Sequence, residues 1–359
     1  MTILCPDVKI PDVQITAPRT IQVRWAAAAA KLSSGEALVE IDRVSLCGSD
    51  YRLYDGTYGG PMAYPMRFGH EWSGRVLEAG PAVGLAPGTP VTGDCSRYCS
   101  SCDRCVRDRN LCRTIEKFGL TVPGFSIRRR VVDQRYLYPD PYDLDPGVLA
   151  LTEIFAVAMH GLAAVLPDLP TAPYPDAVLI VGAGALGMAT MIAAAHHYGI
   201  GEVHLLEIDA EKAASVRRRA GTAQIIDAPE PGAIDGLKTY AAISAMATYP
   251  LVVDCSGSAL GLSTALALAD VRGMVLCFGL GSHGPSRTDL VVTKALTVQG
   301  SIGGTGAFPD ALALLSRQQD LARTLLTHLY PAAKARDAFE STAADPTRIK
   351  TQITFDEEA

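Results

Sequence analysis

The sequence lacks the features that would place the protein on nucleic acid or in a membrane. Its 32 Lys and Arg are outnumbered by 38 Asp and Glu, and the formal net charge is −6 at pH 7. No basic stripe is therefore available to neutralise phosphates, which argues against a nucleic-acid partner. No apolar run reaches the roughly 20 residues that a bilayer crossing needs, so no membrane association is expected.

A secretion signal is also missing. Met1 to Asp7 contain neither a basic segment nor an apolar one, so we expect no signal peptide and predict a cytoplasmic protein. In that compartment, clustered cysteines favour metal binding over disulfides.

The chain is long enough for two domains. It has 359 residues, 48% of them hydrophobic, which can bury a large core. From about residue 20 to 155, short β-type runs broken by Gly and Pro predict an irregular, barrel-like all-β module. After Ala150, expected strands at 177–181, 202–208, 251–255 and 274–278 alternate with helices at about 184–198 and 210–219. This alternation predicts a parallel sheet with right-handed crossovers.

Four of the nine cysteines follow the spacing C-x2-C-x2-C-x6-C, at Cys99, Cys102, Cys105 and Cys112. Their segment, residues 95–113, is polar and has no hydrophobic periodicity, so it cannot form a core of its own. Four thiolates satisfy the closed tetrahedral shell of a structural zinc, which would hold such a segment in order. Cys95, four positions before Cys99, is an alternative to Cys112 as the fourth ligand.

A second candidate metal site combines Cys47 with the pair His70-Glu71. A thiolate, an imidazole and a carboxylate all suit zinc, and three protein ligands leave a coordination position for chemistry. Ser49 adds a hydroxyl that can pass a proton. We therefore predict a catalytic zinc held by Cys47, His70 and Glu71.

A glycine-rich turn predicts a dinucleotide site. Gly182, Gly184 and Gly187 form G-x-G-x-x-G, with Ala185 and Leu186 before the last glycine, directly after an apolar strand and at the start of a helix. These glycines allow a tight turn, close approach of the backbone to a pyrophosphate, and close packing of strand on helix.

An acid twenty-five residues past Gly182 completes this pattern. Glu207 ends the next expected strand, where a carboxylate can accept the ribose hydroxyls and would repel a 2′-phosphate, so NAD is predicted over NADP. Asp209 competes for the same role, and either acid can instead simply open the following helix.

Gly69-His70-Glu71, followed by Gly74, Gly80 and Val83, resembles the zinc signature of the medium-chain dehydrogenase/reductase family. The resemblance covers nearly the whole chain, and the polyol and sugar dehydrogenase branch is the most similar. It implies an α/β protein with a GroES-like irregular β-barrel catalytic domain and a Rossmann domain with a doubly wound parallel sheet. The resemblance implies a catalytic domain at 1–155, which includes the structural-zinc lobe 95–113. The NAD-binding Rossmann domain is implied at 156–295, and residues 296–359 would return to the catalytic domain. Relatives are homo-oligomers, dimers or tetramers.

The resemblance also implies further site residues. Glu153 would be the fourth candidate ligand of the catalytic zinc, acting directly or through water, and it occupies a position typical of polyol dehydrogenases. Asp50 would orient the ligand imidazole from the second shell of the metal. Further cofactor contacts are implied at Cys255, Ser256, Phe278, Leu280, Ser301, Gly303 and Lys350, the last of them reaching the pyrophosphate.

Arg52 departs from the family pattern, which often has a histidine there for proton transfer. A guanidinium that is always charged cannot shuttle a proton. Either water, a ribose hydroxyl and Ser49 complete the route, or Arg52 binds an anionic or polyhydroxylated substrate. Tyr54, like Tyr51 and Tyr58, could line a polar pocket there or simply pack with one wet edge.

These observations predict a zinc- and NAD-dependent dehydrogenase of a sugar, polyol or (amino)cyclitol. The alternatives are a zinc-free NADPH enone or quinone reductase on the same fold, and a non-catalytic binding protein on a dehydrogenase scaffold. The Cys47, His70 and Glu71 set argues against the first alternative, and the intact glycine loop argues against the second.

Overall fold

The computed structural model describes residues 9–27, 31–169, 175–221, 224–230, 232–279 and 286–355. The chain forms two compact units. Unit 1 comprises the residues up to Ala156 together with those from Gly303 onward, and unit 2 is Val157–Ile302. The chain passes between the units twice, inside helix α4 (Thr152–Val165) and immediately before Gly303.

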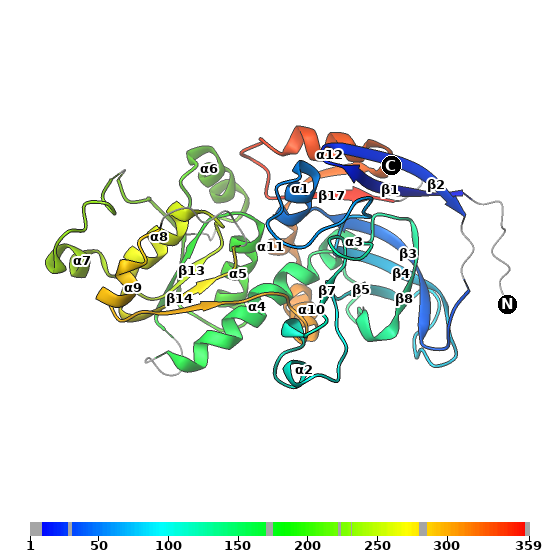
Figure 1. Ribbon diagram of the computed structural model, residues 1–359, viewed down its shortest axis with the longest axis horizontal. Coiled ribbons are helices and arrows are strands. Elements are labelled where there is room, and N and C mark those ends of the chain that lie inside the picture. Colours follow the sequence, from blue (N-terminus) through cyan, green and yellow to red (C-terminus); the bar gives the residue numbers. More distant parts are fainter. Residues whose placement is uncertain are drawn as a thin grey trace. The chain divides into compact units, whose positions relative to one another are not determined.

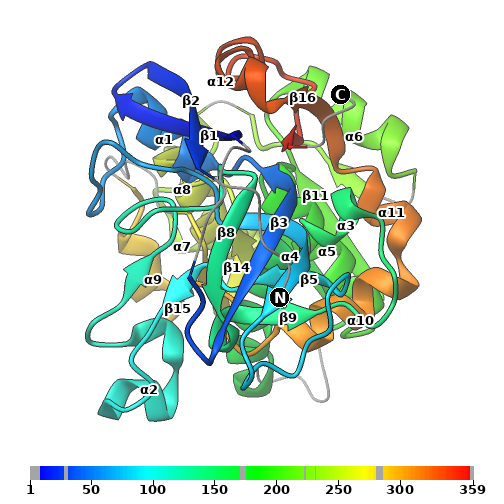
Figure 2. The same cartoon turned by 90° about the vertical axis from the view of Figure 1, so that its right-hand side faces the viewer.

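Unit 1 is built on a seven-stranded sheet that is antiparallel except where β16 pairs with β17 (Figure 2). The order is β16-β17-β3-β4-β5-β9, and β8 pairs with β3. The strands are β3 (Glu36–Ser45), β4 (Glu71–Ala79), β5 (Pro90–Gly93), β8 (Arg129–Asp133), β9 (Leu137–Pro139), β16 (Leu326–Pro331) and β17 (Lys350–Thr354). The core of the unit includes Trp72, whose ring stacks on Phe125 with centroids 4.3 Å apart.

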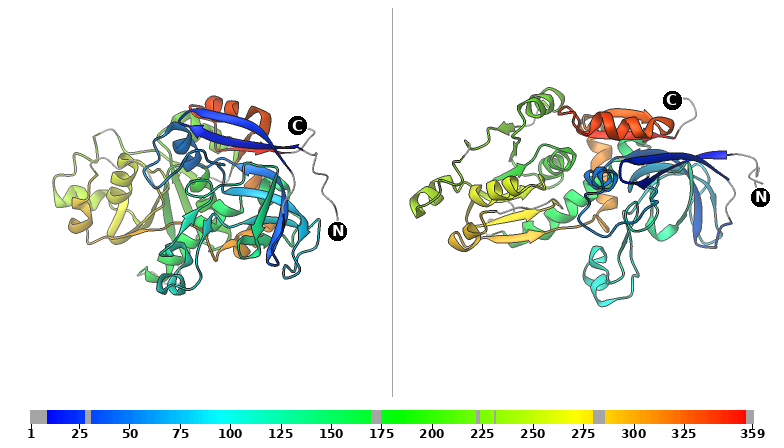
Figure 3. Two further views of the ribbon diagram at one scale, coloured as in Figure 1. Left: turned by 45° about the vertical axis from the view of Figure 1, so that its right-hand side comes forward. Right: turned by 45° about the horizontal axis from the view of Figure 1, so that its top comes forward.

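Two hairpins and several short helices complete unit 1. The hairpins are β1 (Lys9–Ala17) with β2 (Thr20–Ala27), and β6 (Ser96–Arg97) with β7 (Glu116–Lys117). The helices are α1 (Gly48–Asp55), α2 (Asp103–Arg107), α3 (Pro146–Leu149), α10 (Phe308–Arg317), α11 (Gln319–Arg323) and α12 (Ala335–Thr342), with 3-10 turns η1 (Arg109–Leu111), η2 (Gln134–Tyr136) and η4 (Ala332–Lys334). Figure 3 shows the first hairpin beside α12, where Ile15 and Phe339 belong to one apolar core.

Unit 2 is a six-stranded, all-parallel sheet in the order β12-β11-β10-β13-β14-β15, with helices packed on it (Figure 1). Its strands are β10 (Ala177–Val181), β11 (Glu202–Leu206), β12 (Gln224–Ile226), β13 (Tyr249–Asp254), β14 (Ala269–Cys277) and β15 (Thr297–Gly300). Its other elements are η3 (Leu166–Asp168), α5 (Ala185–His196), α6 (Ala210–Arg219), α7 (Tyr240–Met246), α8 (Ala259–Leu268) and α9 (Asp289–Thr293). This strand order reverses beside β10, as in the Rossmann fold. The predicted α/β class is therefore confirmed.

The sequence of β10 shows why the sheet is covered on both faces. Val178, Leu179, Ile180 and Val181 are all buried. A strand with no polar alternation needs apolar partners on both of its faces, which helices on both sides of a parallel sheet provide.

The expectation that residues 20–155 contain only short strands is incomplete, because Gly48–Asp55 form helix α1. The side chain of Asp50 accepts the backbone N–H of Cys47 at 2.8 Å, which caps the first turn of the helix. The tyrosines of this segment concealed its helical pattern.

One helical run, Pro146–Asp168, is long and apolar enough by length and composition to cross a membrane. The apolar window of this run is 78% buried inside the protein, as in a core helix. The sequence expectation that no run reaches such a length missed this segment, because Glu153 and His160 interrupt it.

Candidate functional site

Cys47, His70 and Glu71 lie together in unit 1, with one ligand atom of each within 4.8 Å of the others. Cys47 precedes α1, and Glu71 begins β4. The pairing of β3 with β4 sets Glu71 opposite Ser45, two residues before Cys47, so the sheet register brings the two ligand segments together. His70 and Glu71 are buried. Sulfur, nitrogen and oxygen donors at this spacing suit zinc.

Asp50 ties these two segments to each other. Its fully buried carboxylate accepts the backbone N–H of Cys47 at 2.8 Å and that of Gly69 at 3.0 Å. The same carboxylate lies 3.8 Å from Nδ1 of His70. Burial raises the pKa of Asp50, against the lowering effect of His70 and of the two backbone N–H groups. The hydrogen bonds of Asp50 thus hold the backbone of both ligand segments, whereas its carboxylate lies beyond hydrogen-bond distance of the imidazole that it was expected to orient.

Lys350 lies beside the third candidate ligand. Its Nζ is 2.7 Å from Oε2 and 2.8 Å from Oε1 of Glu71, and the side chain is only 2% exposed. Burial alone would lower the pKa of Lys350, but the charges of Glu71, Cys47 and Glu153 and the hydrogen bond to Glu71 together raise it. The sequence prediction placed this amine at the cofactor pyrophosphate. Instead the structure places the amine against Glu71. Because β17 pairs with β3, the first residues of β17 lie next to the segments that carry the metal candidates.

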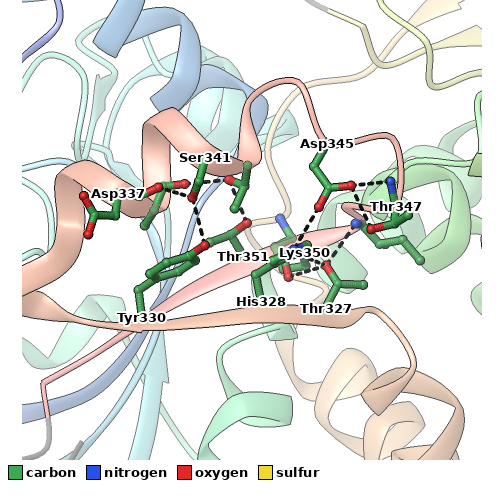
Figure 4. A network of polar contacts seen from close by, with 12 residues as sticks. Thr327, His328, Tyr330, Asp337, Ser341, Asp345, Thr347, Lys350 and Thr351 are labelled. Atoms are coloured by element: carbon green, nitrogen blue, oxygen red, sulfur yellow. Dashed lines mark hydrogen bonds and ion pairs between the residues drawn. The ribbon is translucent and has the colours of Figure 1, made fainter.

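The backbone around Lys350 is fixed by a polar network (Figure 4). Thr327 Oγ1 donates to the carbonyl of Lys350 at 3.1 Å and accepts the N–H of Ile349 at 3.1 Å. In the preceding loop, Asp345 accepts from Thr347 and lies 3.0 Å from Nε2 of His328. These contacts hold the start of β17, and with it the lysine, in place.

Glu153 is buried in the first turn of α4, but it lies outside the group formed by Cys47, His70 and Glu71. Burial raises its pKa, and the charges of His70 and Glu71 act on it, so Glu153 belongs to the surroundings of the same site. Cys95 contacts Glu153 too, since each side chain affects the pKa of the other. Sequence reasoning did not foresee this contact.

The other side chains predicted around α1 divide into two groups. Ser49 Oγ and Arg52 Nε are buried and make no hydrogen bond within the described residues. Tyr54, in contrast, stacks on Phe339 at 4.9 Å and donates to Glu340 at 2.8 Å. Tyr54 is thus a packing residue, and its expected role at the substrate is not supported, because its hydroxyl is engaged with α12.

The four clustered cysteines come together in the lobe around α2. Cys102 and Cys105 have sulfurs 3.5 Å apart, as do Cys99 and Cys112. The backbone N–H groups of Cys99 and Thr114 donate to the sulfur of Cys112, at 3.3 and 3.4 Å. Cys95 lies outside this cluster, with its sulfur 3.4 Å from Ser96 Oγ. The geometry therefore favours Cys112 over Cys95 as the fourth ligand.

Asn110, inside the cysteine lobe, binds the chain where it re-enters unit 1. Its Oδ1 accepts the N–H of Thr305 at 3.1 Å, and its Nδ2 donates to the carbonyl of Thr305 at 3.3 Å. A Cβ on Gly303 would lie 2.2 Å from the same Oδ1. Thr305 also donates to the buried carboxylate of Asp94 at 2.9 Å. Gly303 thus fits closely against the lobe, a contact for which the sequence offers no local signal.

In unit 2, the predicted glycine turn follows β10. Gly182 adopts φ +98°, a conformation that glycine tolerates best. A Cβ on Gly187 would lie 1.9 Å from the carbonyl oxygen of Gly182, so only glycine permits this packing of helix on turn. No atom of the described chain lies within 4 Å of a Cβ on Gly184, which precedes α5. This open space at a helix N-terminus suits a pyrophosphate, with the backbone of Ala185 and Leu186 beside it.

Glu207 lies directly beside this turn. Its Oε2 accepts the N–H of Ala183, and its Oε1 accepts the N–H of Asp209, both at 3.1 Å. Asp209 itself caps α6 by accepting the N–H of Lys212 at 2.9 Å. The geometry therefore separates the two competing acids: Glu207 faces the glycine turn, and Asp209 opens the next helix.

The other predicted cofactor residues follow the ends of neighbouring strands. Ser256 lies 3.2 Å from the position of a Cβ on Gly182, so the turns after β10 and β13 touch. Cys255 is a packing thiol, 3.7 Å from Thr190 Oγ1. The ring of Phe278 packs on Gly161 of α4, and Ser301 Oγ is 3.2 Å from Nδ1 of His160. Leu280 lies outside the described residues.

A cavity of about 640 Å³ adjoins Glu207 in unit 2. It begins at Ile208, follows the end of β12 at Ala228 and reaches Leu260 and Ser263 of α8. Its lining combines apolar side chains, such as those of Ile208 and Leu260, with the acids Glu230 and Asp235.

Comparisons with known proteins agree with this geometry. Residues 33–142 match the model of the alcohol dehydrogenase GroES-like domain, and residues 185–317 match that of the zinc-binding dehydrogenase. A sorbitol dehydrogenase of Halalkalibacterium halodurans is 26% identical over 84% of this chain and 87% of its own length. The crystal structure of L-idonate 5-dehydrogenase from Escherichia coli superposes with a TM-score of 0.83 at 22% identity, covering 97% of this chain and 98% of that one.

A zinc-binding dehydrogenase of Sinorhizobium meliloti 1021, crystallised with NADP, superposes with a TM-score of 0.79 at 24% identity, covering 96% of this chain and 99% of the other. At these identities the solved structures establish the fold alone. The matched domains, in their order along the chain, establish the family. The chain is a member of the zinc-type medium-chain alcohol dehydrogenase family and resembles its polyol dehydrogenases.

Proposed function

We propose that the protein is a zinc-dependent dehydrogenase that transfers a hydride between NAD and a secondary alcohol or ketone of a sugar, polyol or (amino)cyclitol. The observation that carries this proposal is the Cys47, His70 and Glu71 group in the catalytic domain of a dehydrogenase fold. When bound, zinc lowers the pKa of an alcohol hydroxyl and NAD accepts the hydride.

The surroundings of the metal group support such chemistry. Cys47 and Glu71 each bring one negative charge, and the ammonium of Lys350 offsets that of Glu71. A ligand set of low total charge keeps a metal Lewis acidic. Asp50 holds the backbone of Cys47 and of Gly69, so the two ligand segments stay at a fixed spacing.

Ser49 is the group that we assign to proton transfer. Its buried Oγ has no partner among the described residues, so it is free to hold a proton from the substrate hydroxyl. Arg52 cannot release the proton in turn, because a guanidinium stays charged. Water or a ribose hydroxyl would complete the route.

NAD is proposed over NADP on the position of Glu207. A carboxylate beside the glycine turn can accept ribose hydroxyls and repels a 2′-phosphate. The cavity next to it supports a site for the adenine ring. The relative bound to NADP shows that this fold also accepts the phosphorylated cofactor, and the substrate screen therefore uses NAD and NADP in parallel.

The polyol class is proposed on Glu153 and on the sorbitol dehydrogenase relative. A buried carboxylate beside the metal group can accept a hydrogen bond from a second hydroxyl of the substrate. From the resemblance to the family we also propose a homo-oligomer, a dimer or tetramer.

The two alternatives are less well supported. A zinc-free NADPH reductase would have no use for the Cys47, His70 and Glu71 group, nor for the acid at Glu207. A non-catalytic binding protein would not need the open space over Gly184.

A substrate screen tests the proposal. The zinc-loaded protein is incubated with polyols, sugars, cyclitols and simple alcohols, with NAD and NADP in parallel, and reduced cofactor is measured by its absorbance. We expect turnover of at least one polyhydroxylated substrate with NAD. Turnover confined to enones or quinones with NADPH would contradict the proposal.

A further inference from the structure

Helix α1 carries two polar side chains that its packing leaves without a partner. Ser49 Oγ and Arg52 Nε are buried and unbonded within the described residues. Residues three apart share one face of a helix, so these two side chains lie on the same side. The other side of α1 is filled, because Tyr51 and Tyr54 pack their rings against Phe339.

The guanidinium of Arg52 also has no counter-charge. Several other arginines of unit 1 do have carboxylate partners, for example Arg19, 3.0 Å from Asp55 at the end of α1, and Arg67, 2.8 Å from Asp12. No ion pair of Arg52 is found in the described part of the chain. The Arg52 side chain is half-buried, and an anion that pairs with the guanidinium would give its buried Nε a partner.

The position of this guanidinium relates it to the metal group. Its Nη2 lies 3.9 Å from the point where a Cβ on Gly48 would be, so the side chain folds back over the residue that follows Cys47. Because consecutive Cα atoms are about 3.8 Å apart and the side-chain bonds add a few ångströms, Nη2 of Arg52 lies within roughly 12 Å of the Cys47 thiolate. A five- or six-carbon substrate that is bound at both of its ends spans a gap of this order.

Tyr58, six residues after Arg52, packs partly buried against the core of unit 1. Burial raises the pKa of its hydroxyl, and the charges of both Arg52 and Cys47 act on it. The hydroxyl is therefore a neutral donor near the guanidinium. A fixed cation and a neutral donor together form a suitable surface for carboxylate or phosphate oxygens, which a guanidinium binds through two parallel hydrogen bonds.

We propose that Arg52, assisted by Tyr58, binds an anionic group of the substrate while the carbinol to be oxidised lies at Cys47, His70 and Glu71. The substrate is then a sugar acid or a sugar phosphate rather than a neutral polyol. This inference rests on the proposed function, and it makes Arg52 a specificity-determining residue. Ser49, on the same face, keeps its role in proton transfer.

The experiment compares three probes with the same six-carbon skeleton: sorbitol, gluconate and sorbitol 6-phosphate. The enzymes are wild type, Arg52→Gln, Arg52→Lys and the control Arg24→Gln, which removes the same charge from an exposed position on β2. Three readouts are taken: KM and kcat with NAD, the Kd of NADH from its fluorescence, and binding of gluconate, sorbitol 6-phosphate and inorganic phosphate by calorimetry.

We expect wild type to prefer one anionic probe over sorbitol by at least tenfold in kcat/KM, the preferred probe identifying carboxylate or phosphate. Arg52→Gln should raise the KM of that probe roughly 10- to 100-fold, because the charge-assisted hydrogen bonds between the guanidinium and the anionic group are lost. The KM of sorbitol and the Kd of NADH should stay within about twofold, because neither ligand makes these hydrogen bonds. Arg52→Lys should restore part of the preference. Arg24→Gln should match wild type.

Two results would overturn the inference while the proposed function stands. Weaker NADH binding in Arg52→Gln with an unchanged probe preference would assign the guanidinium to a cofactor phosphate. An equal effect on all three probes would assign it a structural role. If wild type oxidises none of the three probes, calorimetry decides this inference, and the wider substrate screen decides the proposed function separately. Arg52-dependent binding of an anion then supports the inference, and the absence of such binding overturns it.

Discussion

Nζ of Lys350 lies 2.7 Å from Oε2 of Glu71, and both side chains are almost completely buried. The two residues are 279 positions apart in the chain. This ion pair connects the last strand of the protein to a candidate metal ligand. Removing one partner of a buried ion pair strongly destabilises the folded protein, because the remaining charge has no water to solvate it.

Replacing Lys350 should therefore harm the metal site specifically. Lys350→Met leaves Glu71 without its counter-charge. We expect zinc to be retained more tightly at the Cys47 site, because the full negative charge of Glu71 then faces the metal. We also expect at least tenfold lower kcat, because an uncompensated carboxylate reduces the Lewis acidity of the metal. Zinc content after mild chelation and kcat measure both effects. Lys334→Met, on the surface turn η4, is the control. An unchanged kcat with normal zinc content would show that the pair does not tune the metal.

The contact of Asn110 with Thr305 should stabilise the point where the chain re-enters unit 1. Asn110→Ala removes two hydrogen bonds to the backbone of Thr305 and leaves both backbone groups buried and unpaired. Such a loss costs about 1–3 kcal/mol for each buried group. We expect a lower melting temperature with all zinc retained, measured by calorimetry and metal analysis. Zinc loss at an unchanged melting temperature would instead assign Asn110 to the metal lobe alone.

Asp94 provides a prediction about pH. Its carboxylate is fully buried, one oxygen lacks a hydrogen bond within the described residues, and burial raises its pKa to about 6. A carboxyl whose pKa in the folded protein exceeds the unfolded value of about 3.9 destabilises the fold when it is ionised. This loss of folding stability is absent below pH 4, grows between pH 4 and 6, and is complete above pH 6.

Asp94→Asn keeps the acceptor for Thr305 and replaces the charged oxygen by a neutral amide. We expect this variant to be more stable than wild type at pH 7.5, by at most roughly 3 kcal/mol on the scale of 1.36 kcal/mol per pKa unit, and equally stable at pH 4. Melting temperatures of the two proteins across this range measure the difference. A difference that stays constant with pH would contradict a buried carboxylate that titrates near 6.

The glycine turn should tolerate no side chain at Gly187. A Cβ there would lie 1.9 Å from the carbonyl oxygen of Gly182, which must move and would displace the pyrophosphate turn. Gly187→Ala should weaken NADH binding at least tenfold, measured by fluorescence titration. Gly201→Ala, whose Cβ would meet only Asp176 oxygen at 3.9 Å, is the matched control. Equal affinities of the two variants would refute the dinucleotide assignment of this turn.

The cofactor preference should depend on Glu207. Glu207→Gln keeps an acceptor for the N–H of Ala183 but removes the charge that repels a 2′-phosphate. We expect the ratio of kcat/KM for NAD over NADP to fall by at least tenfold, whereas Asp209→Asn should leave it within about twofold. A larger effect from Asp209 would reverse the assignment of the two acids.

The features that the sequence predicts well are local. The glycine turn and the four clustered cysteines each lie within one short segment, so their spacing alone carries the geometry. The parallel sheet of unit 2 follows from apolar strands such as Val178–Val181, buried on both faces. The three metal candidates also could be foreseen, since Cys47, His70 and Glu71 lie on neighbouring strand ends.

The features that the sequence hides are contacts between distant segments. Nothing near Lys350 indicates Glu71, and Asn110 and Thr305 are 195 residues apart. Only strand pairing and loop packing bring such groups together. Helix α1 was missed for a different reason: its capping by Asp50 matches a helix start, but its tyrosines suit a strand equally well.

Metal stoichiometry together with activity tests the central claim most directly. Zinc per chain is measured in wild type, Cys47→Ser and Cys102→Ser, and each protein is assayed for oxidation of an alcohol with NAD. The account predicts about two zinc ions per chain in wild type and one in each variant. Cys47→Ser should lose turnover, whereas the folded fraction of Cys102→Ser should keep it. A wild type with a single zinc, or a Cys47→Ser variant that keeps two zinc ions and full turnover, would contradict it.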